Sequence, residues 1–467
     1  MKRFSIIVLG ALAMLMAGCS KDAPVSPPDE NAWIKDVNLP VPVLFGSSSL
    51  SATTKADDPG MIEGETLIER RVGVIGIDAD AETWREKPLN SNGTLYTLNK
   101  DALLLHKLVR TTTEGNIEFN PREYYPLVSD QNFNFYGYYP ENLSSNLYLS
   151  TRTELPGSSS GNQIVAINCD IGYQDILWAG TTNDNKVFEY GTDDEGNPLT
   201  VTGYNAKYIR KIKYAQMDID ADETLSDAVK EEKKAELESY MPQLKFKHCL
   251  SAARFYVQAK DSHAAGTFKN SPESPNDPNG TILEVTGLTL KGLYNKGSLI
   301  VAIKENNTGE DISKWEGVVV PASGASSTSI VLTQPNGDDI EPVVPIVSAK
   351  ELGKGLMLIP GSETLDYSDG IEGIVTYNIW VRNQDGSPVL NEDGTQMKQT
   401  KSLDVKFPVS ADNNFIAGKR YAFTIVFNSL EEVMIKTSLE AWDDNHPGGN
   451  GYEIEGGGEG GEHIEIE

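Results

Sequence analysis

Residues 71–77 read Arg71-Val72-Gly73-Val74-Ile75-Gly76-Ile77, and this stretch decides the fold class. Apolar residues recur at alternate positions, which is the period of a β-strand, and the glycines leave room for another backbone to approach. The sequence therefore predicts an all-β protein. The same period-two pattern returns in the aromatic run at 133–139 and in the apolar runs at 163–167, 244–257, 282–290, 329–333, 356–359, 374–381, 421–427 and 433–441.

Two segments depart from this regular pattern. The apolar run at 41–45 lies beside prolines, which suits an edge strand because proline cannot donate to a sheet ladder. Residues 223–241 combine leucine, alanine and valine with many lysines and glutamates, a composition that favours a helix with i,i+4 charge pairs. We expect one exposed helix inserted between strands at 223–241.

The domain organisation follows from composition. Residues 271–280 are rich in turn formers and lack apolar side chains, which marks a boundary. The glycine- and glutamate-rich end of the chain is predicted to be disordered. We divide the chain into a signal peptide at 1–18, a tether at 19–39, an N-terminal β-sandwich domain at 40–268, a linker at 269–279, a C-terminal β-sandwich domain at 280–445 and a flexible tail at 446–467.

The first twenty residues predict export. After the basic start Met1-Lys2-Arg3, residues 5–17 are apolar but too few for the ~20 needed to cross a bilayer as a helix. Ala17 and Gly18 directly before Cys19 resemble the lipobox of bacterial lipoproteins, in which the cysteine is lipidated. The alternative is an ordinary cleaved signal with an incidental cysteine.

The tripeptide Ser20-Lys21-Asp22 resembles the export signal that Bacteroidetes lipoproteins carry when they reach the outer face of the outer membrane. Acyl chains such as palmitate would anchor the protein there without a transmembrane helix. Cys169 and Cys249 lie in apolar runs and are expected to be buried small hydrophobes in preference to a disulfide.

Charge and cysteine content exclude whole classes of function. The 467 residues hold 68 acidic and 40 basic side chains, for a formal net charge of −28, and no basic stripe occurs. Nucleic-acid binding through phosphate neutralisation is therefore excluded. Three cysteines in a chain of this length exclude a disulfide scaffold and argue against a cysteine-based zinc site.

No motif in the chain indicates catalysis, a metal or a cofactor. The five histidines, at 106, 248, 263, 446 and 463, stand at no metal-ligand spacing, and we expect His248 to be a packed, hydrogen-bonded core residue. Asp218, Asp220 and Asp222 are spaced like the start of a calcium loop, but the loop fails at its sixth and twelfth positions. We interpret these aspartates as an acidic helix N-terminus and predict that the protein is not an enzyme.

Several motifs occur in a fixed order across about 400 residues. They are Pro42-Val43-Leu44-Phe45 with Thr53-Thr54-Lys55-Ala56, the aromatic run at 133–140, Asp175-Ile176-Leu177-Trp178-Ala179, Phe246-Lys247-His248-Cys249-Leu250-Ser251, the run at 285–290, Met357-Leu358-Ile359-Pro360, and Gly418-Lys419-Arg420-Tyr421 leading to Ala441-Trp442-Asp443-Asp444. Together with the lipobox, they resemble the fimbrillin family, the type V pilus subunits of Bacteroidales.

The resemblance implies a fold and an assembly route. The fold would be two tandem transthyretin-like β-sandwich domains. The route would be export as a lipoprotein, proteolysis in the loop after the first strand, and filling of the vacated groove by a strand of another fimbrial subunit. A physical argument supports this route independently of the resemblance. A sheet that loses an edge strand exposes unpaired backbone groups, and an incoming strand can form hydrogen bonds with them.

Two sets of residues would serve this route. We expect the cut between the runs at 41–45 and 72–77, at Arg70 or Arg71 ahead of Lys55, although Arg70 and Arg71 also suit solvated charges at a strand start. The tail alternates apolar and acidic residues and supplies the candidate donor strand, with Tyr452, Ile454, Ile464 and Ile466.

The sequence thus predicts a structural or adhesive subunit of a surface fimbria, located at the cell outer membrane and able to contact a host or bacterial ligand. An alternative of another class is a monomeric surface lipoprotein that binds a glycan on aromatic platforms. The platform residues would be Tyr136, Tyr138, Tyr139 and Trp178, which the strand pattern also allows as core and cross-strand pairs. A secreted hydrolase has no supporting motif.

Overall fold

The computed structural model describes most of the chain from residue 31 onward. The residues it describes are 31–46, 67, 69–88, 95–98, 103–113, 116–127, 131–151, 163–181, 187–192, 198–200, 204–268, 282–304, 313–334, 336–362, 365–384, 387–409, 414–430, 432–440 and 464–465. The predicted signal peptide, Cys19, the linker at 269–279 and most of the tail lie outside them. Among these residues, no helix combines the length and the apolar character needed to cross a bilayer.

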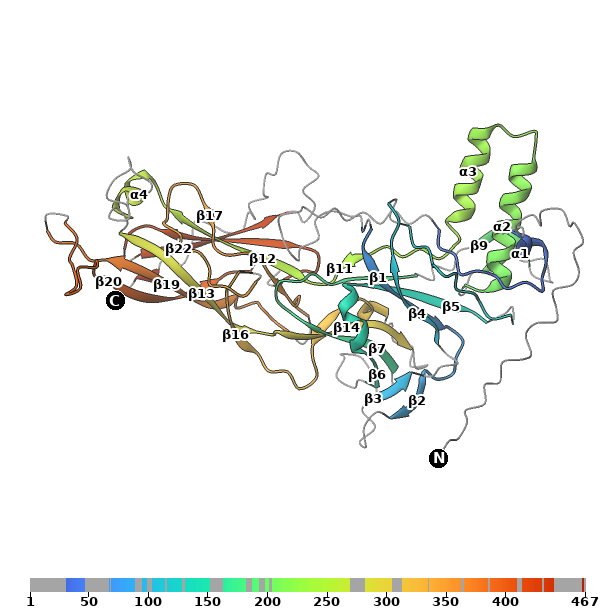
Figure 1. The fold of residues 1–467 in the computed structure, drawn as a ribbon, viewed down its shortest axis with the longest axis horizontal. Coiled ribbons are helices and arrows are strands. Elements are labelled where there is room, and N and C mark those ends of the chain that lie inside the picture. Colours follow the sequence, from blue (N-terminus) through green and yellow to red (C-terminus); the bar gives the residue numbers. More distant parts are fainter. Residues whose placement is uncertain are drawn as a thin grey trace, which may run out of the picture.

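The molecule is elongated, and its strands form two regions along the long axis (Figure 1). The region on the right contains the β1 sheet, in the order β11–β8–β5–β1–β4, and the β7 sheet, in the order β15–β14–β7–β6–β3–β2. Their bounds are β1 Arg71–Asp78, β2 Arg85–Pro88, β3 Leu95–Leu98, β4 Leu103–Arg110, β5 Phe133–Tyr139, β6 Leu147–Thr151, β7 Gln163–Asp170, β8 Leu177–Gly180, β11 Lys247–His248, β14 Lys296–Lys304 and β15 Val319–Pro321.

The region on the left contains the β12 sheet, in the order β17–β12–β21–β22–β23 with β18 also paired to β12, and the β13 sheet, in the order β16–β13–β19–β20. Their bounds are β12 Ser251–Ala259, β13 Leu283–Leu293, β16 Thr328–Val331, β17 Lys350–Glu351, β18 Leu356–Leu358, β19 Ile371–Trp380, β20 Lys398–Phe407, β21 Arg420–Phe427, β22 Glu432–Glu440 and β23 Ile464–Glu465. A separate ribbon pairs β9 Val187–Thr192 with β10 Pro198–Thr200.

The sheets of each region pack face to face, so the expectation of an all-β sandwich protein is confirmed. In the right-hand region, Ile75 and Ile77 of β1 share a buried cluster with Val165 of β7 and Leu299 of β14. In the left-hand region, aromatic rings join the two sheets, and the ring centroids of Phe255 on β12 and Phe407 on β20 lie 5.4 Å apart. Such edge-to-face ring pairs add to the burial of apolar area.

The β1 sheet is buried on both faces. Alternate residues of β1 point to opposite sides, so Ile75 and Ile77 face the β7 sheet, whereas Val72 and Val74 belong to a second cluster on the other side. That second face is covered by the N-terminal segment, defined here as residues 31–46, and by helix α2. A strand that is covered on both faces is expected to be apolar, with little alternation between buried and exposed residues.

Strands from each half of the chain enter both regions. β12, at 251–259, lies parallel to β21, with Ala252 opposite Arg420. β14, at 296–304, lies antiparallel to β7, with Lys296 opposite Asp170. The exact domain boundaries at 268 and 280 remain a prediction, but the strand pairing joins residues on either side of the predicted linker.

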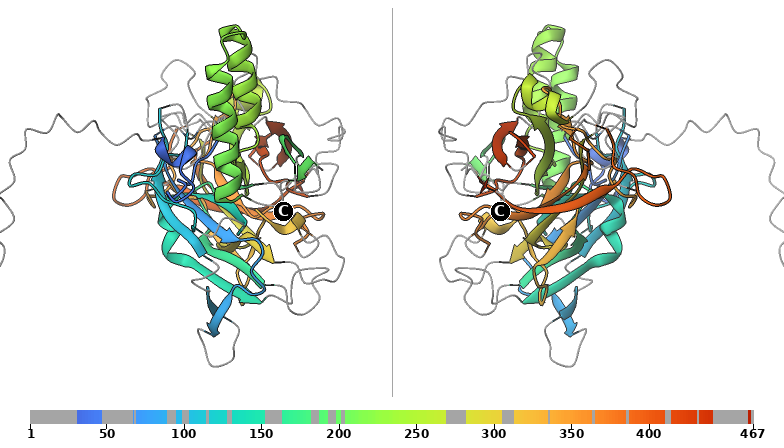
Figure 2. Two further views of the ribbon diagram at one scale, coloured as in Figure 1. Left: turned by 90° about the vertical axis from the view of Figure 1, so that its right-hand side faces the viewer. Right: turned by 90° about the vertical axis from the view of Figure 1, so that its left-hand side faces the viewer.

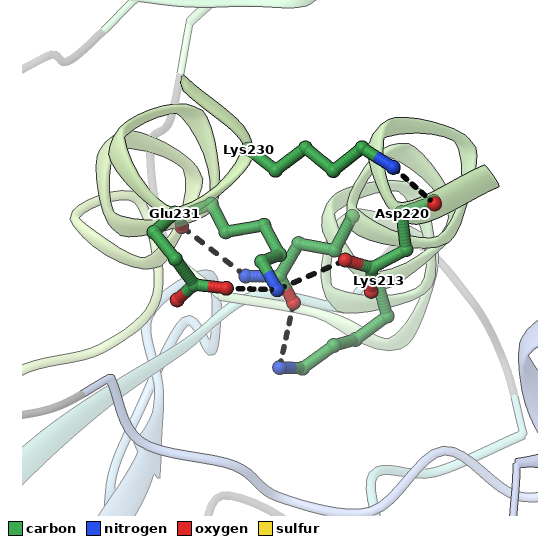
Figure 3. A network of polar contacts seen from close by, with 6 residues as sticks. Lys213, Asp220, Lys230 and Glu231 are labelled. Atoms are coloured by element: carbon green, nitrogen blue, oxygen red, sulfur yellow. Dashed lines mark hydrogen bonds and ion pairs between the residues drawn. The ribbon is translucent and has the colours of Figure 1, made fainter. Parts of the chain in front are cut away.

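The predicted single helix at 223–241 is part of a helical hairpin. Helix α2, Ala206–Ala221, precedes α3, Asp227–Glu238, and the pair projects from the right-hand region (Figures 1 and 2). Lys234 joins the two helices through its ammonium group, which lies 2.9 Å from Asp220 Oδ1 and 2.7 Å from Glu231 Oε1. Figure 3 shows Asp220 and Glu231 on the two neighbouring helices. Ion pairs this exposed contribute little, so the hairpin depends on the apolar face of α2.

Two shorter helices complete the architecture, α1 at Ala32–Lys35 and α4 at Ser262–Phe268. Short 3₁₀ turns lie at Glu141–Asn146 and Ser313–Trp315. The position of α1 corrects the prediction for 19–39, because residues 31–39 are part of the folded body and not of a tether. Trp33 and Ile34 supply the reason, since both are buried against α2 and its neighbours.

Candidate functional site

The N-terminal segment is held to the body by a short antiparallel pairing. Val43 donates its backbone N–H to Glu123 O at 2.8 Å, and Tyr125 N–H donates to Val41 O at 2.9 Å. At the end of the segment, Gly46 N–H donates to Pro242 O at 3.0 Å. The run at 41–45 therefore does not form the predicted edge strand, because its described pairing is a single isolated bridge between Pro42 and Tyr124.

The side chains of the N-terminal segment complete a core. Val41 and Val43 are 1% and 4% exposed, and Trp33 and Ile34 are also buried. The ring of Phe45 packs edge-on against Phe135 of β5, with the ring centroids 5.2 Å apart. The face of the β1 sheet beneath them carries a buried apolar cluster that includes Val72, Val74, Phe133, Phe135, Leu177 and Ala179. Loss of residues 31–46 would therefore expose a large hydrophobic surface.

The glycine that ends the N-terminal segment is required by close packing. A Cβ atom at Gly46 would lie 2.7 Å from the backbone oxygen of Glu238, at the end of α3. A larger residue at this position would force the chain away from the helical hairpin. The segment thus fits its site by shape as well as by apolar character.

The structure places two of the three candidate cleavage residues, and both are exposed but anchored. Arg70 N–H donates to Thr111 Oγ1 at 3.0 Å, and Thr111 N–H donates to Arg70 O at 2.9 Å. Arg71 is the first residue of β1, and its guanidinium lies 2.9 Å from Glu141 Oε2. Just upstream, Leu67 is fully buried. Lys55 and the lipidation candidate Cys19 lie outside the described residues.

Of the candidate donor-strand residues, the structure places Ile464. Ile464 and Glu465 form β23, which pairs antiparallel with β22 so that Ile464 is opposite Val433. Tyr452, Ile454 and Ile466 lie outside the described residues. The end of the chain therefore lies at the edge of the β12 sheet of its own molecule.

The structure brings together two of the sequence motifs through a histidine–aspartate pair. His248 Nδ1 lies 2.6 Å from Asp175 Oδ2, and Asp175 is completely buried. Asp175 Oδ1 accepts the backbone N–H of Ile176 at 2.8 Å. His248 is therefore hydrogen-bonded, as expected, but it is half-buried and not a core residue. His106 on β4 lies 2.7 Å from the hydroxyl of Tyr138, and burial lowers the pKa of His106.

Three of the four aromatic residues offered as a glycan platform belong to the interior, and the fourth, Tyr139, is half-buried. Tyr136, Tyr138 and Trp178 are 5%, 0% and 8% exposed. The indole N–H of Trp178 donates to Val301 O at 2.9 Å, which ties the ring to the β7 sheet. A ring buried on both faces cannot stack on a sugar, so these three residues give no support to the alternative function.

The two internal cysteines behave as buried small hydrophobes. Cys169 and Cys249 are both buried thiols, 4% and 1% exposed. Burial raises the pKa of Cys169 to about 12 and that of Cys249 still higher. A thiol that resists ionisation in this way is a poor nucleophile, because the thiolate is the reactive form.

The interpretation of the three aspartates as a helix N-terminus is wrong. Asp218 and Asp220 lie in the last turns of α2, and Asp222 is its C-terminal cap. Asp222 Oδ1 accepts from Thr224 N–H at 2.8 Å and from the Thr224 hydroxyl at 2.6 Å. The error arose because α2 was not predicted. Within the described part of the chain, no group of acidic, histidine or cysteine side chains could hold a metal ion.

The part of the site that sequence reasoning missed is α2, which forms one wall of the cluster under the N-terminal segment. Its buried residues include Ile209, Ile212 and Ile219. A spacing of three and seven residues is a helical signal, and Asn205 is a good N-cap whose side chain accepts from Tyr208 N–H at 2.8 Å. Isoleucine and tyrosine are weak helix formers, which hid this signal.

Comparison with known proteins places the chain near fimbrial and adhesion proteins. No family model and no curated protein matches the sequence. Among solved structures, the matches include a proposed cell adhesion protein from Bacteroides uniformis (12% identity, TM-score 0.37, covering 86% of this chain and 98% of the other). They also include the fimbrial anchor protein Mfa2 (11%, 0.30, 86% and 98%) and a fimbrilin (10%, 0.34, 84% and 92%), both from Porphyromonas gingivalis. At these values, the likeness by itself carries no conclusion about function.

Proposed function

We propose that this protein is a structural or adhesive subunit of a cell-surface fimbria, exported as a lipoprotein and assembled by strand exchange after proteolysis. Cys19 would carry the acyl anchor at the outer membrane, and the partners would be other fimbrial subunits. The single observation that carries the proposal is the N-terminal segment, which completes a buried core but is joined to the described body by few backbone hydrogen bonds, at residues 123–125 and 242.

The energetics favour exchange over simple loss of the segment. Full burial of an aliphatic or aromatic side chain contributes ~1.5–3 kcal/mol. Trp33, Ile34, Val41 and Val43 are all buried, so they contribute on the order of 6–12 kcal/mol before the entropy cost of ordering the segment. A cut segment would therefore leave only when another strand buries a comparable surface. Such assembly needs no ATP.

The contacts at Arg70 and Arg71 revise the expected order of the cleavage candidates. A cut at either residue has to break the pairing with Thr111 or the start of β1 first. Surface segments without such pairing are the usual sites of proteolysis. We therefore place the cut ahead of Leu67, where Lys55 is the basic candidate.

The tail remains the proposed donor strand. The pairing of Ile464 with Val433 supports its capacity to join a sheet edge, because residues 464–465 do so within the same chain. In a fibre, the same residues would pair with the backbone groups that loss of the N-terminal segment uncovers on a neighbour, such as Glu123 O and Tyr125 N–H. Main-chain hydrogen bonds would supply affinity and alternate side chains would supply specificity, as in other β-augmentation.

Limited proteolysis tests the whole route. The mature protein treated with a trypsin-like protease should form SDS-resistant ladders, and N-terminal sequencing of the ladder should give a new start at residue 56. Lys55→Ala should block ladder formation, whereas Arg70→Ala with Arg71→Ala should not. Fibres that begin at acylated Cys19 would contradict the cleavage step. Ladders formed by a chain lacking 448–467 would remove the tail from the mechanism.

A further inference from the structure

Helix α2 contacts the N-terminal segment through one arginine at two points. Arg210 Nε donates to Trp33 O at 2.9 Å, and Arg210 Nη2 donates to Leu39 O at 2.9 Å. Trp33 lies in α1 and Leu39 lies just before the extended run at 41–45. One guanidinium therefore bridges the helical and the extended parts of the segment. Both acceptors are main-chain carbonyls.

The body fixes the position of Arg210. The start of α2 is joined to β5, because Tyr204 and Phe133 exchange backbone hydrogen bonds of 3.0 and 2.8 Å. Asn205 Nδ2 also donates to Asn132 Oδ1 at 2.8 Å. Beside Arg210 in the sequence, Ile209 is fully buried. The guanidinium is thus presented from a rigid base to a segment that has only a short ladder of its own.

Arginine is suited to this contact by its geometry. Its planar group presents several donors in a fixed fork, so two acceptors can be bound at once with little loss of side-chain freedom. The last carbonyls of a helix have no intrahelical partner, and in α1 the carbonyl of Trp33 is satisfied by Arg210. A lysine at this position could direct its single ammonium at one carbonyl but would not span both with the same fork.

We infer that Arg210 is a clamp, a positioning residue that keeps residues 31–46 seated on the β1 sheet after the chain has been cut. The clamp binds only main-chain oxygen atoms, so it depends on the backbone conformation of the segment and not on the identity of its side chains. It sets how fast the cut segment can be displaced, and hence how fast a strand from a second copy of this chain can take its place. That last step rests on the proposed function, whereas the clamp itself does not.

Retention of the cut fragment tests the clamp without any polymerisation. The chain from residue 20 onward receives a site-specific protease recognition sequence in place of residues 52–58, so that the cut does not depend on the natural processing residue. After cleavage, the release of the N-terminal fragment is followed by size-exclusion chromatography in the presence of excess synthetic peptide 31–46, which prevents rebinding. The measured quantity is the rate constant for release of the N-terminal fragment.

Loss of two hydrogen bonds from a charged donor should accelerate release about tenfold or more for Arg210→Met. The Arg210→Lys variant should release the fragment several-fold faster than the original chain. It replaces Arg210→Met as the test variant if the methionine variant folds poorly. Lys211→Met, a change of similar size at the next position of α2, should release at the original rate. Release within about twofold of the original rate for Arg210→Met or for Arg210→Lys, in a chain with unchanged circular dichroism, would overturn the clamp.

The two proposals fail separately. A faster release without any change in ladder formation would support the clamp and count against strand exchange. An unchanged release rate together with SDS-resistant ladders would overturn the clamp and leave the proposed function intact.

Discussion

The contribution of the N-terminal segment to stability can be tested with the double variant Val41→Ala and Val43→Ala. Both side chains are nearly completely buried. Each change removes two methyl groups, which costs about 1.6 kcal/mol in transfer free energy at ~0.8 kcal/mol per group. The cavities left behind raise the cost to about 2 kcal/mol per site, or about 4 kcal/mol for the pair. We expect the free energy of unfolding to fall by this amount.

Urea denaturation followed by circular dichroism measures this free energy by linear extrapolation. Val37→Ala is the matched control, because Val37 lies in the same segment but is 72% exposed. It should change the free energy of unfolding by less than about 0.5 kcal/mol, as is usual for surface sites. A loss below about 1 kcal/mol for the double variant would refute the view that this segment is an integral part of the core.

Three further predictions concern the β1 sheet and its neighbours. Burial lowers the pKa of His106 in the folded protein. The stabilising contribution of the neutral imidazole is therefore complete above about pH 6.5, the pKa in the unfolded chain, and is lost as the pH falls toward the pKa in the folded protein. His106→Gln should thus narrow the difference between the free energies of unfolding at pH 7.5 and at pH 5. Asp175→Asn should cost about 2 kcal/mol in urea denaturation because a buried hydrogen-bonded pair is broken, whereas the exposed control Asp170→Asn should cost almost nothing. Gly73→Ala should lower the melting temperature by several degrees, because its Cβ would meet an aromatic ring at 2.0 Å, and Gly172→Ala, with open space around it, should not.

Several strands were predictable, but their partners were not. Residues 71–77 and 133–139 were recognised as short runs rich in β-branched and aromatic residues, and they form β1 and β5. β20, at Lys398–Phe407, was not predicted, since most of its residues are exposed and polar. The parallel pairing of β12 with β21 depends on contacts far apart in the chain, which local periodicity does not encode.

The candidate site was predicted in part. Composition identified the run at 41–45 as an apolar edge strand; Val41 and Val43 are buried, but the run forms one isolated bridge in place of a strand. Composition also placed residues 31–39 in a tether, because prolines and polar residues surround Trp33 and Ile34. Their burial depends on α2, and α2 is rich in residues with weak helix propensity. A local rule could therefore not find this part of the site.

The pairing of strands that lie far apart in the sequence has a consequence for how the newly made chain folds. One edge of β7 stays unpaired until β14 has been synthesised, and β12 lacks its parallel neighbour until β21, near the end of the chain, has been synthesised. A chain that is synthesised from its N-terminus thus carries open strand edges until nearly all of it has been made. Such late-closing contacts slow folding and lengthen the time during which the unpaired edges can aggregate.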